Sequence, residues 1–301
     1  MNFCEAKSEL KQLLSRVDPS ELPKLLDWMK NSDDLDDFLL DNRTVILQNI
    51  SDDLRTRLPL NAMLASETTA HLKIQQCSRP TLHVDSFLYD EDQVDSLCED
   101  GTMSRTFCLN CGSQKTAALD FVSHSFSISE LRFLFQNVLP DLSGRTLVDV
   151  GSRLGAVLYG GYVYSSASRL LGLEISEEFV QLQNEMLQKY QLTDRVQVIH
   201  ADVCTQEVLL QNTDVLVMNN VFEYFMEPSE QIRAWRFIIQ SFRKSGSLLV
   251  STPSLQESLG ALQQEALLPG WVEELPVDYN VYLGRDSDPE NLRQIHLYRV
   301  M

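Results

Sequence analysis

Long apolar runs are absent from this 301-residue sequence. No stretch approaches the ~18 consecutive apolar residues that a helix needs to cross a bilayer, so we expect no membrane-spanning segment. The residues from Met1 to Lys7 contain neither a basic cluster nor an apolar core, so we expect no signal peptide. Cysteine is also scarce, with six in the chain and no framework spacing, which is typical of reduced thiols in the cytoplasm or the nucleus.

Basic side chains are in short supply as well. The chain has 25 Lys and Arg against 43 Asp and Glu, for a net charge of −18. Proteins that bind nucleic acid phosphates usually present a basic face, and none is visible here. The charge therefore disfavours nucleic acid as the main partner. It fits a cationic substrate, and a simple need for solubility explains it equally well. Residues 1–100 hold 20 acidic and 10 basic residues, so much of the acidity lies in the first third.

Residues 1–80 are predicted to be helical. Apolar side chains recur at i, i+3, i+4 and i+7, the spacing that places them on one face of a helix. They are Leu10, Leu13, Leu14 and Val17, followed by Leu22, Leu25, Leu26 and Met29. We interpret the segment as a helical accessory region that ends near Arg79-Pro80. Its acidic stretch at residues 33–38 is interpreted as a solvated helix face, with an interaction motif as the alternative.

Residues 81–126 are interpreted as a linker that contains a hairpin with a Gly turn at residues 104–122. The hairpin includes Cys108 and Cys111, which are spaced as C-x-x-C and followed by glycine, as in zinc knuckles. A structural zinc needs four ligands, and Cys98 and His124 are the nearest further candidates, with Cys77 more distant. We favour a plain turn with two reduced thiols and keep zinc as the alternative. A redox pair is disfavoured because no thioredoxin-like βαβ unit surrounds the cysteines.

From residue 127 onward, predicted helices alternate with predicted strands. The strands are expected at residues 146–150, 170–174, 196–203, 214–220 and 247–252, with two more in the tail at 271–282 and 294–300. The helices are expected at residues 127–139, 154–168, 176–191 and 228–243. Such alternation predicts an α/β fold, a doubly wound and mostly parallel sheet, preceded by the helical N-terminal region.

The first of these strands runs into a glycine-bearing turn, Asp149-Val150-Gly151-Ser152-Arg153-Leu154-Gly155. A turn of this kind lets the backbone approach a ligand closely and directs helix N–H groups at it. The second strand ends in Glu174, whose carboxylate can accept both hydroxyls of a ribose. The third is followed by Asp202, which can accept an adenine amino group. The fourth leads into Asn219–Phe225, at the edge of the sheet where open α/β sheets bind ligands.

On these residues the sequence resembles the class I S-adenosylmethionine (SAM)-dependent methyltransferases over residues 127–301. The resemblance implies a Rossmann-like methyltransferase fold and SAM as cofactor, with no metal. It places the cofactor against Asp149, Gly151, Ser152, Arg153, Gly155, Glu174, Ile175, Asp202, Val203 and Asn219. It places Asn219, Asn220, Glu223 and Tyr224 at the reacting centre. Gly151-Ser152 and the Asn219-Asn220 pair also resemble DOT1-type lysine methyltransferases, but the basic nucleosome-binding segments of such enzymes are absent.

Arg153 departs from the family, which usually has glycine at this position. Its cation has three possible roles: to pair with the cofactor carboxylate, to point to solvent, or to block SAM and leave a non-catalytic relative. Other residues have structural alternatives too. Asp149 can cap the following helix, Asn219 and Asn220 can be turn formers, and His124 can be a structural histidine instead of a base.

The functional hypothesis is a SAM-dependent methyltransferase that acts on a protein or peptide side chain, with an amine nitrogen as the candidate acceptor. Aromatic side chains such as Tyr224 and Phe225 would form one wall of the acceptor pocket together with Glu223, because aromatic faces favour a nearby cation. The alternatives are a small-molecule or RNA methyltransferase, and a methyltransferase-like binding or scaffold protein without turnover. The oligomeric state is not predicted.

Overall fold

The computed structural model describes residues 3–31, 33–109, 115–281 and 289–301. Contacts divide the chain into two units, residues 1–46 and 47–301. The first unit contains the helices α1 (Phe3–Leu14) and α2 (Leu22–Asn31) and the beginning of α3 (Asp33–Arg55). The division falls within α3, well before Arg79-Pro80, because residues 47–80 pack into the core of the second unit. In the described part of the chain, no helix is long and apolar enough to span a bilayer.

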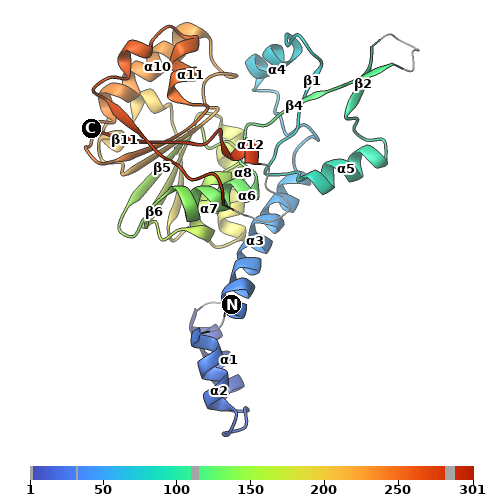
Figure 1. The fold of residues 1–301 in the computed structure, drawn as a ribbon, viewed down its shortest axis with the longest axis vertical. Helices are drawn as coiled ribbons and strands as arrows, with labels where there is room; N and C mark the ends of the chain where they lie inside the picture. The colour runs from blue at the N-terminus through green and yellow to red at the C-terminus, as the bar shows by residue number, and fades with distance from the viewer. Residues whose placement is uncertain (1–2, 32, 110–114, 282–288) are drawn as a thin grey trace. The chain divides into compact units, whose positions relative to one another are not determined.

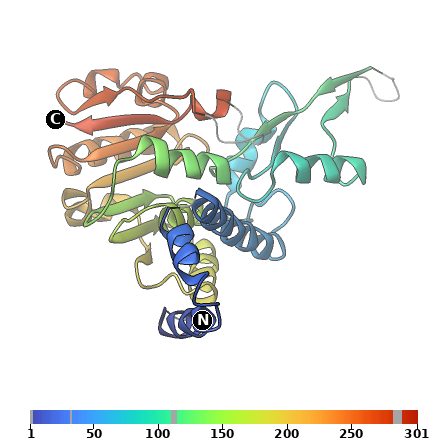
Figure 2. The same cartoon turned by 60° about the horizontal axis from the view of Figure 1, so that its bottom comes forward.

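The second unit is built on a seven-stranded sheet with the order β10-β11-β9-β8-β5-β6-β7 (Figures 1 and 2). The five parallel strands are β5 (Thr146–Val150), β6 (Arg169–Glu174), β7 (Val196–His200), β8 (Val215–Asn219) and β9 (Leu248–Thr252). The strands β11 (His296–Val300) and β10 (Val272–Leu275) complete it, with β11 antiparallel to both β9 and β10. This arrangement confirms the predicted doubly wound, mostly parallel sheet.

The order of the strands determines where a ligand can bind. The chain begins at the central strand β5, winds outward through β6 and β7, and then crosses to β8 and β9 on the other side. The helices that follow β5 and β8 therefore leave in opposite directions, and a crevice opens at the carboxyl ends of these two strands.

Both faces of the sheet are covered by helices. One face packs against α6 (Ile128–Phe133), α7 (Ala156–Tyr164) and α8 (Glu177–Lys189), and the other against α10 (Pro228–Ser241) and α11 (Leu255–Ala261). Successive strand residues alternate between the faces, so Leu147 joins the first core and Val148 the second. Burial on both faces explains why these strands are nearly continuous apolar runs.

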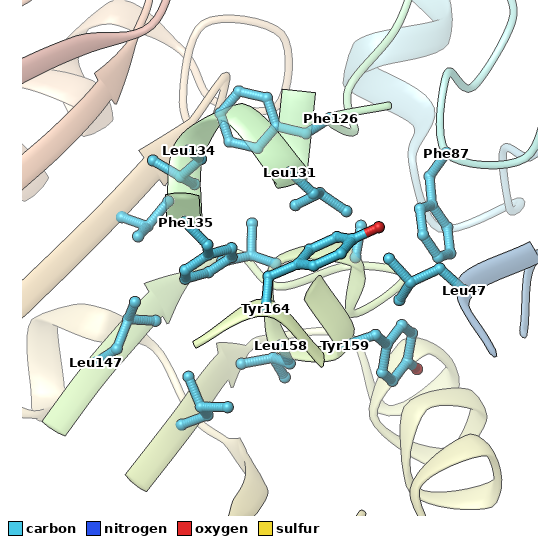
Figure 3. Packing of buried hydrophobic residues seen from close by; sticks show 14 of the residues in the cluster. Leu47, Phe87, Phe126, Leu131, Leu134, Phe135, Leu147, Leu158, Tyr159 and Tyr164 are labelled. Atoms are coloured by element: carbon cyan, nitrogen blue, oxygen red, sulfur yellow. The ribbon is translucent and has the colours of Figure 1, made fainter. Parts of the chain in front are cut away.

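Residues 47–126 form an extension that shares the core with the sheet. Leu47 and Phe87 from this extension are buried in the same cluster as Leu131 and Tyr159 (Figure 3). The extension contains the end of α3, then α4 (Thr68–Gln75), β1 (Thr81–His83), α5 (Glu91–Glu99), β2 (Thr106–Cys108), β3 (Thr116–Ala118) and β4 (Asp120–Val122). The strand β1 pairs in parallel with β4. This shared core makes residues 47–126 part of the domain.

The strands β2 and β3 pair antiparallel, as expected for the arms of the predicted hairpin, whose Gly turn lies outside the described residues. Cys111 lies outside the described residues, so the C-x-x-C pair remains a prediction. Cys98 packs in a small apolar cluster with Val94, whereas His124 is buried beside His83. Among the described residues, no group of three His, Cys, Asp or Glu side chains is arranged to hold a metal ion.

Several short elements were not predicted from the sequence. The helix at residues 127–139 is α6 followed by one π-helical segment, η1 (Leu134–Val138). Further short helices are η2 (Val203–Thr205), α9 (Glu207–Gln211), η3 (Glu265–Leu267) and α12 (Pro289–Leu292). Each is three to five residues long, too short to show a full helical period in the sequence.

Candidate cofactor site

The turn after β5 is built for close backbone approach. Gly151, Arg153 and Gly155 all have positive φ angles, +68°, +43° and +86°. A Cβ atom on Gly155 would lie 2.7 Å from the Tyr159 ring, so a larger residue here would be strained and would force that ring to move. The N–H groups of Gly151 and Ser152 donate to the Leu173 carbonyl at 2.8 and 3.1 Å, which fixes the turn against β6.

A cavity of about 710 Å³ opens at the carboxyl ends of β5, β6, β7 and β8. Its size is within the range of small-molecule and cofactor pockets. Six of the predicted cofactor-binding residues line it, namely Gly151, Arg153, Glu174, Ile175, Asp202 and Val203. The other four, Asp149, Ser152, Gly155 and Asn219, lie behind or beside this lining.

Glu174 is the buried carboxylate of the cavity. Its two oxygens accept the backbone N–H groups of Arg153 and Ser176, both at 2.8 Å. Burial raises the pKa of Glu174, although these backbone hydrogen bonds favour the ionised form. A carboxylate offers about four acceptor sites. The Ile175 backbone also hydrogen-bonds this carboxylate, so about one acceptor site is left for a ribose hydroxyl, and the residue fits the predicted role.

Asp202 and Asp149 differ in how they relate to the cavity. Asp202 is half-buried in the lining and accepts the Cys204 N–H at 2.8 Å, capping η2. Asp149 is buried beneath the turn, where desolvation and the Glu174 charge raise its pKa well above the usual range. Its placement suits a support for the turn, whereas Asp202 is open to a ligand.

Arg153 does not point to solvent, which was one of the three roles considered for it from the sequence. Its side chain is buried, with Nε 2.7 Å from Glu67 and Nη1 3.0 Å from Asp85, and Nη2 donates to the Ala62 carbonyl at 2.5 Å. The guanidinium also lies 5.1 Å from the centre of the Phe179 ring. We call this group of Arg153, Glu67 and Asp85 the clasp. Its partners come from residues 47–126, so the family's glycine has been exchanged for an ion pair between two segments of the domain.

The clasp holds a roof over the cavity. Ser66 and Glu67, followed by Thr69 and Ala70 of α4, line the cavity opposite the strand ends. Lys73 of the same helix donates to the carbonyls of Glu223 and Met226 at 3.0 and 2.7 Å. Sequence reasoning missed the roof, because α4 carries no motif and its contacts are made across about 90 to 150 residues.

The predicted reacting-centre residues are brought together in part. Asn219 donates through Nδ2 to the His124 carbonyl at 3.3 Å, and Asn220 donates to Asn219 Oδ1 at 3.0 Å. Glu223 turns away from the cavity and accepts the Ser258 hydroxyl at 2.7 Å. Tyr224 lies against the His124 ring, with centres 4.8 Å apart. The aromatic wall of the cavity is instead formed by Phe222 and Phe225.

His124 is buried next to His83, with ring centres 4.5 Å apart. Burial lowers the pKa of His124 to about 2, with smaller contributions from the nearby His83 and Arg153, so the ring is neutral. The pKa of His83 is lowered as well, mainly by desolvation. Two neutral imidazoles are thus packed behind Phe225.

Residues 148–250 match the family model described as a methyltransferase domain. No curated protein matches the sequence.

Among solved structures, an RNA methyltransferase from Salinibacter ruber in complex with S-adenosyl-L-homocysteine is 13% identical, with 57% of this chain and 88% of that chain covered and a TM-score of 0.36. An O-methyltransferase from Bacillus cereus in complex with the same molecule is 15% identical, covering 60% and 84%, with a TM-score of 0.39.

The family match spans the strands β6, β7 and β8 and most of β5 and β9, and it contains the turn, Glu174 and Asp202. Glu174 keeps a free acceptor site, the turn keeps its left-handed backbone, and the cavity joins them, so the residues present fit the cofactor that the family uses. The match over residues 148–250 and the geometry of this site together indicate a methyltransferase domain with a site that fits S-adenosylmethionine.

Proposed function

We propose that this protein is an active methyltransferase that transfers the methyl group of SAM to a nitrogen on a protein or peptide side chain. The proposal depends chiefly on one observation, the engagement of the Arg153 guanidinium by Glu67, Asp85 and the Ala62 carbonyl. The cation that would otherwise obstruct a cofactor is held in the wall, and a cavity of about 710 Å³ remains. This favours turnover over the scaffold alternative.

The chain's own residues supply binding and exclusion of water. Glu174 would hold a ribose hydroxyl, Asp202 the adenine amino group, and the backbone at Gly151 the methionine moiety. The bound cofactor supplies a methyl group already activated by the positive sulfonium. The protein's task is then to orient an acceptor and to shield it from water, and Phe222 and Phe225 form an apolar wall suited to this.

The charge of the cavity supports a cationic acceptor. Glu177, Glu178 and Glu230 line it together with Glu67 and Asp202, and among the described residues Arg153 is the one basic side chain of the lining. Such a field attracts a protonated amine and repels the phosphates of RNA. Together with the net charge of −18, this favours a basic protein or peptide over nucleic acid.

Calorimetric titration of the full chain with SAM tests the cofactor half of the proposal. We expect saturable binding, weakened in Glu174→Gln. No heat and no thermal stabilisation at millimolar SAM would instead support a scaffold. Transfer of a tritiated methyl group to a cell extract, separated into protein, RNA and small molecules, tests the acceptor. Label in protein is expected, and label confined to RNA or to small molecules would overturn that half.

A further inference from the structure

Three buried imidazole nitrogens at one place have no hydrogen-bond partner in the described part of the chain. They are Nε2 of His83 and both ring nitrogens of His124. The two side chains are among the most buried polar groups of the domain, with 2% and 5% of their surface exposed. Buried polar atoms are nearly always paired, and leaving them unpaired is costly. A cluster of three therefore indicates a partner that the folded chain does not itself supply.

The pair stands next to the end of the cavity where an acceptor would lie. The His124 carbonyl accepts from Asn219, the last residue of β8. The His124 ring meets the Phe225 ring at 4.8 Å, edge to face, and Phe225 lines the cavity. Phe225 thus contacts the cavity on one side and the imidazole on the other. Neither histidine lines the cavity, so a group in the cavity would reach the pair only if this ring moved aside.

The chemistry of the pair selects its ligand. His83 Nδ1 faces the Asn61 carbonyl at 2.5 Å and must carry the proton, so its Nε2 presents a lone pair. His124, which is neutral, presents one N–H and one lone pair. The pair therefore offers two acceptors and one donor.

We propose that His83 and His124 form the acceptor subsite, in which they bind the N–H groups of an amine nitrogen. The proposal rests on the proposed function, because it gives the methyl acceptor its place. It assigns a role to two residues from the extension 47–126, which the family match does not cover. The two histidines would hold the acceptor after it has lost its proton to water, because only the neutral nitrogen has a lone pair. The N–C bond would then form as the methyl–sulfur bond breaks, with no further group needed from the histidines.

Imidazole NMR on the uniformly ¹⁵N-labelled full chain provides the test, with n-propylamine as the probe and acetate as the anion control. The chain has five histidines, and His200 and His296 lie on the surface or near it. We expect saturable shifts of the His83 and His124 ring signals with the amine, and no such shifts with acetate. Signals of His200 and His296 should stay in place at constant pH.

Variants assign the signals and separate binding from stability. In His124→Gln the amine response should fall at least tenfold in apparent affinity, while SAM binding stays within about twofold of the wild type. The matched control is His296→Gln, which should leave both unchanged because His296 pairs with Glu274, away from the cavity lining. If His124→Gln does not fold, the wild-type titration still decides. No amine-dependent shift at either ring, or equal shifts at all five, overturns the subsite.

The outcome is distinguishable from failure of the proposed function. If the wild-type chain binds SAM and its histidine signals do not shift with the amine, the subsite proposal is wrong and the proposed methyltransferase function is unaffected. If SAM does not bind, the proposed function fails, whatever the imidazoles do.

Discussion

Restoring the family's glycine at position 153 should destabilise this protein. Arg153 has φ +43°, a left-handed conformation that costs a non-glycine residue roughly 1–2 kcal/mol. By this argument alone, Arg153→Gly would be stabilising. Loss of the clasp acts in the opposite direction and destabilises the variant. The side chains of Glu67 and Asp85 are 7% and 0% exposed and would be left without their cation.

The two effects can be weighed. Removing one partner of a buried ion pair costs about 3–5 kcal/mol, since the remaining charge is desolvated and uncompensated. Relief of the backbone strain at position 153 offsets about 1–2 kcal/mol of this loss of stability. The expected net loss is therefore about 1–4 kcal/mol. Arg153→Met loses the same pairs, keeps the strained backbone, and should be the less stable of the two variants.

Urea unfolding followed by tryptophan fluorescence measures the difference. Trp235 and Trp271 are buried in the domain, whereas Trp28 is exposed, so the emission change reports the unfolding of residues 47–301. With an m-value of about 3 kcal/mol/M, a loss of 3 kcal/mol lowers the midpoint by about 1 M. A buried pair is little screened, so the difference should persist in 1 M salt.

A charge-matched control isolates the clasp. Adding Glu67→Gln and Asp85→Asn to Arg153→Gly removes the orphaned charges, and this triple variant should recover part of the lost stability. An unchanged or higher midpoint in Arg153→Gly alone would refute the reasoning, because backbone strain would then outweigh the ion pairs.

Three further predictions concern the cofactor site and its surroundings. Glu174→Gln should weaken SAM binding by about 10–100-fold in calorimetry, because charge-assisted hydrogen bonds are worth about 1.5–3 kcal/mol; unchanged affinity would remove the ribose role. The pKa of His124 is about 2 in the folded state and about 6.5 in the unfolded state. The unfolded chain therefore binds a proton at a higher pH than the folded chain, and the free energy of unfolding should fall as the pH drops below 6.5. At pH 5.5 this lowers the free energy of unfolding by about 1.4 kcal/mol, and the His124→Phe variant should not show this decrease. Asp149 and Glu174 have raised pKa values and so stabilise the fold as the pH drops. They do so in the wild type and in the variant alike, so their effect cancels when the two proteins are compared. Gly155→Ala should lower the free energy of unfolding by about 2–4 kcal/mol, through backbone strain and the clash with Tyr159. The control is Gly144→Ala, at φ +77° with open space around it, which should lower it by only about 1–2 kcal/mol. Equal losses of stability in thermal unfolding would show that the clash is relieved.

The sheet could be predicted because its signal is local. Each parallel strand is a short apolar run between turn residues, and β5 and β9 lie within a residue of the predicted ranges. The acids that follow the strands could be placed as well, since the carboxyl ends of parallel strands meet at one edge. Glu174 and Asp202 accordingly line one cavity.

Side-chain direction in the loop after β8 could not be predicted. Residues 220–227 lie in neither a helix nor a strand, so no period fixes which side chains face the cavity. Phe222 and Phe225 do, whereas Glu223 turns to Ser258. The expectation that Glu223 forms the cavity wall with the aromatic residues was wrong for this reason.

The partners of Arg153 could not be predicted either. Glu67 and Asp85 lie 86 and 68 positions away in the sequence, within stretches that show no motif. The sequence marked Arg153 as a departure from the family, and only the folded chain shows what compensates for it.

The clasp also has a consequence for the history of the chain. A glycine at position 153 suits a domain without buried acids nearby, whereas an arginine suits a domain that has them. A substitution at only one of positions 67, 85 and 153 would therefore give a less stable protein. Arg153, Glu67 and Asp85 are therefore expected to be inherited together or exchanged together among descendants of this sequence. Arg153 and its two acidic partners thus depend on one another, and replacing any one of them alone is expected to lower the stability of the domain.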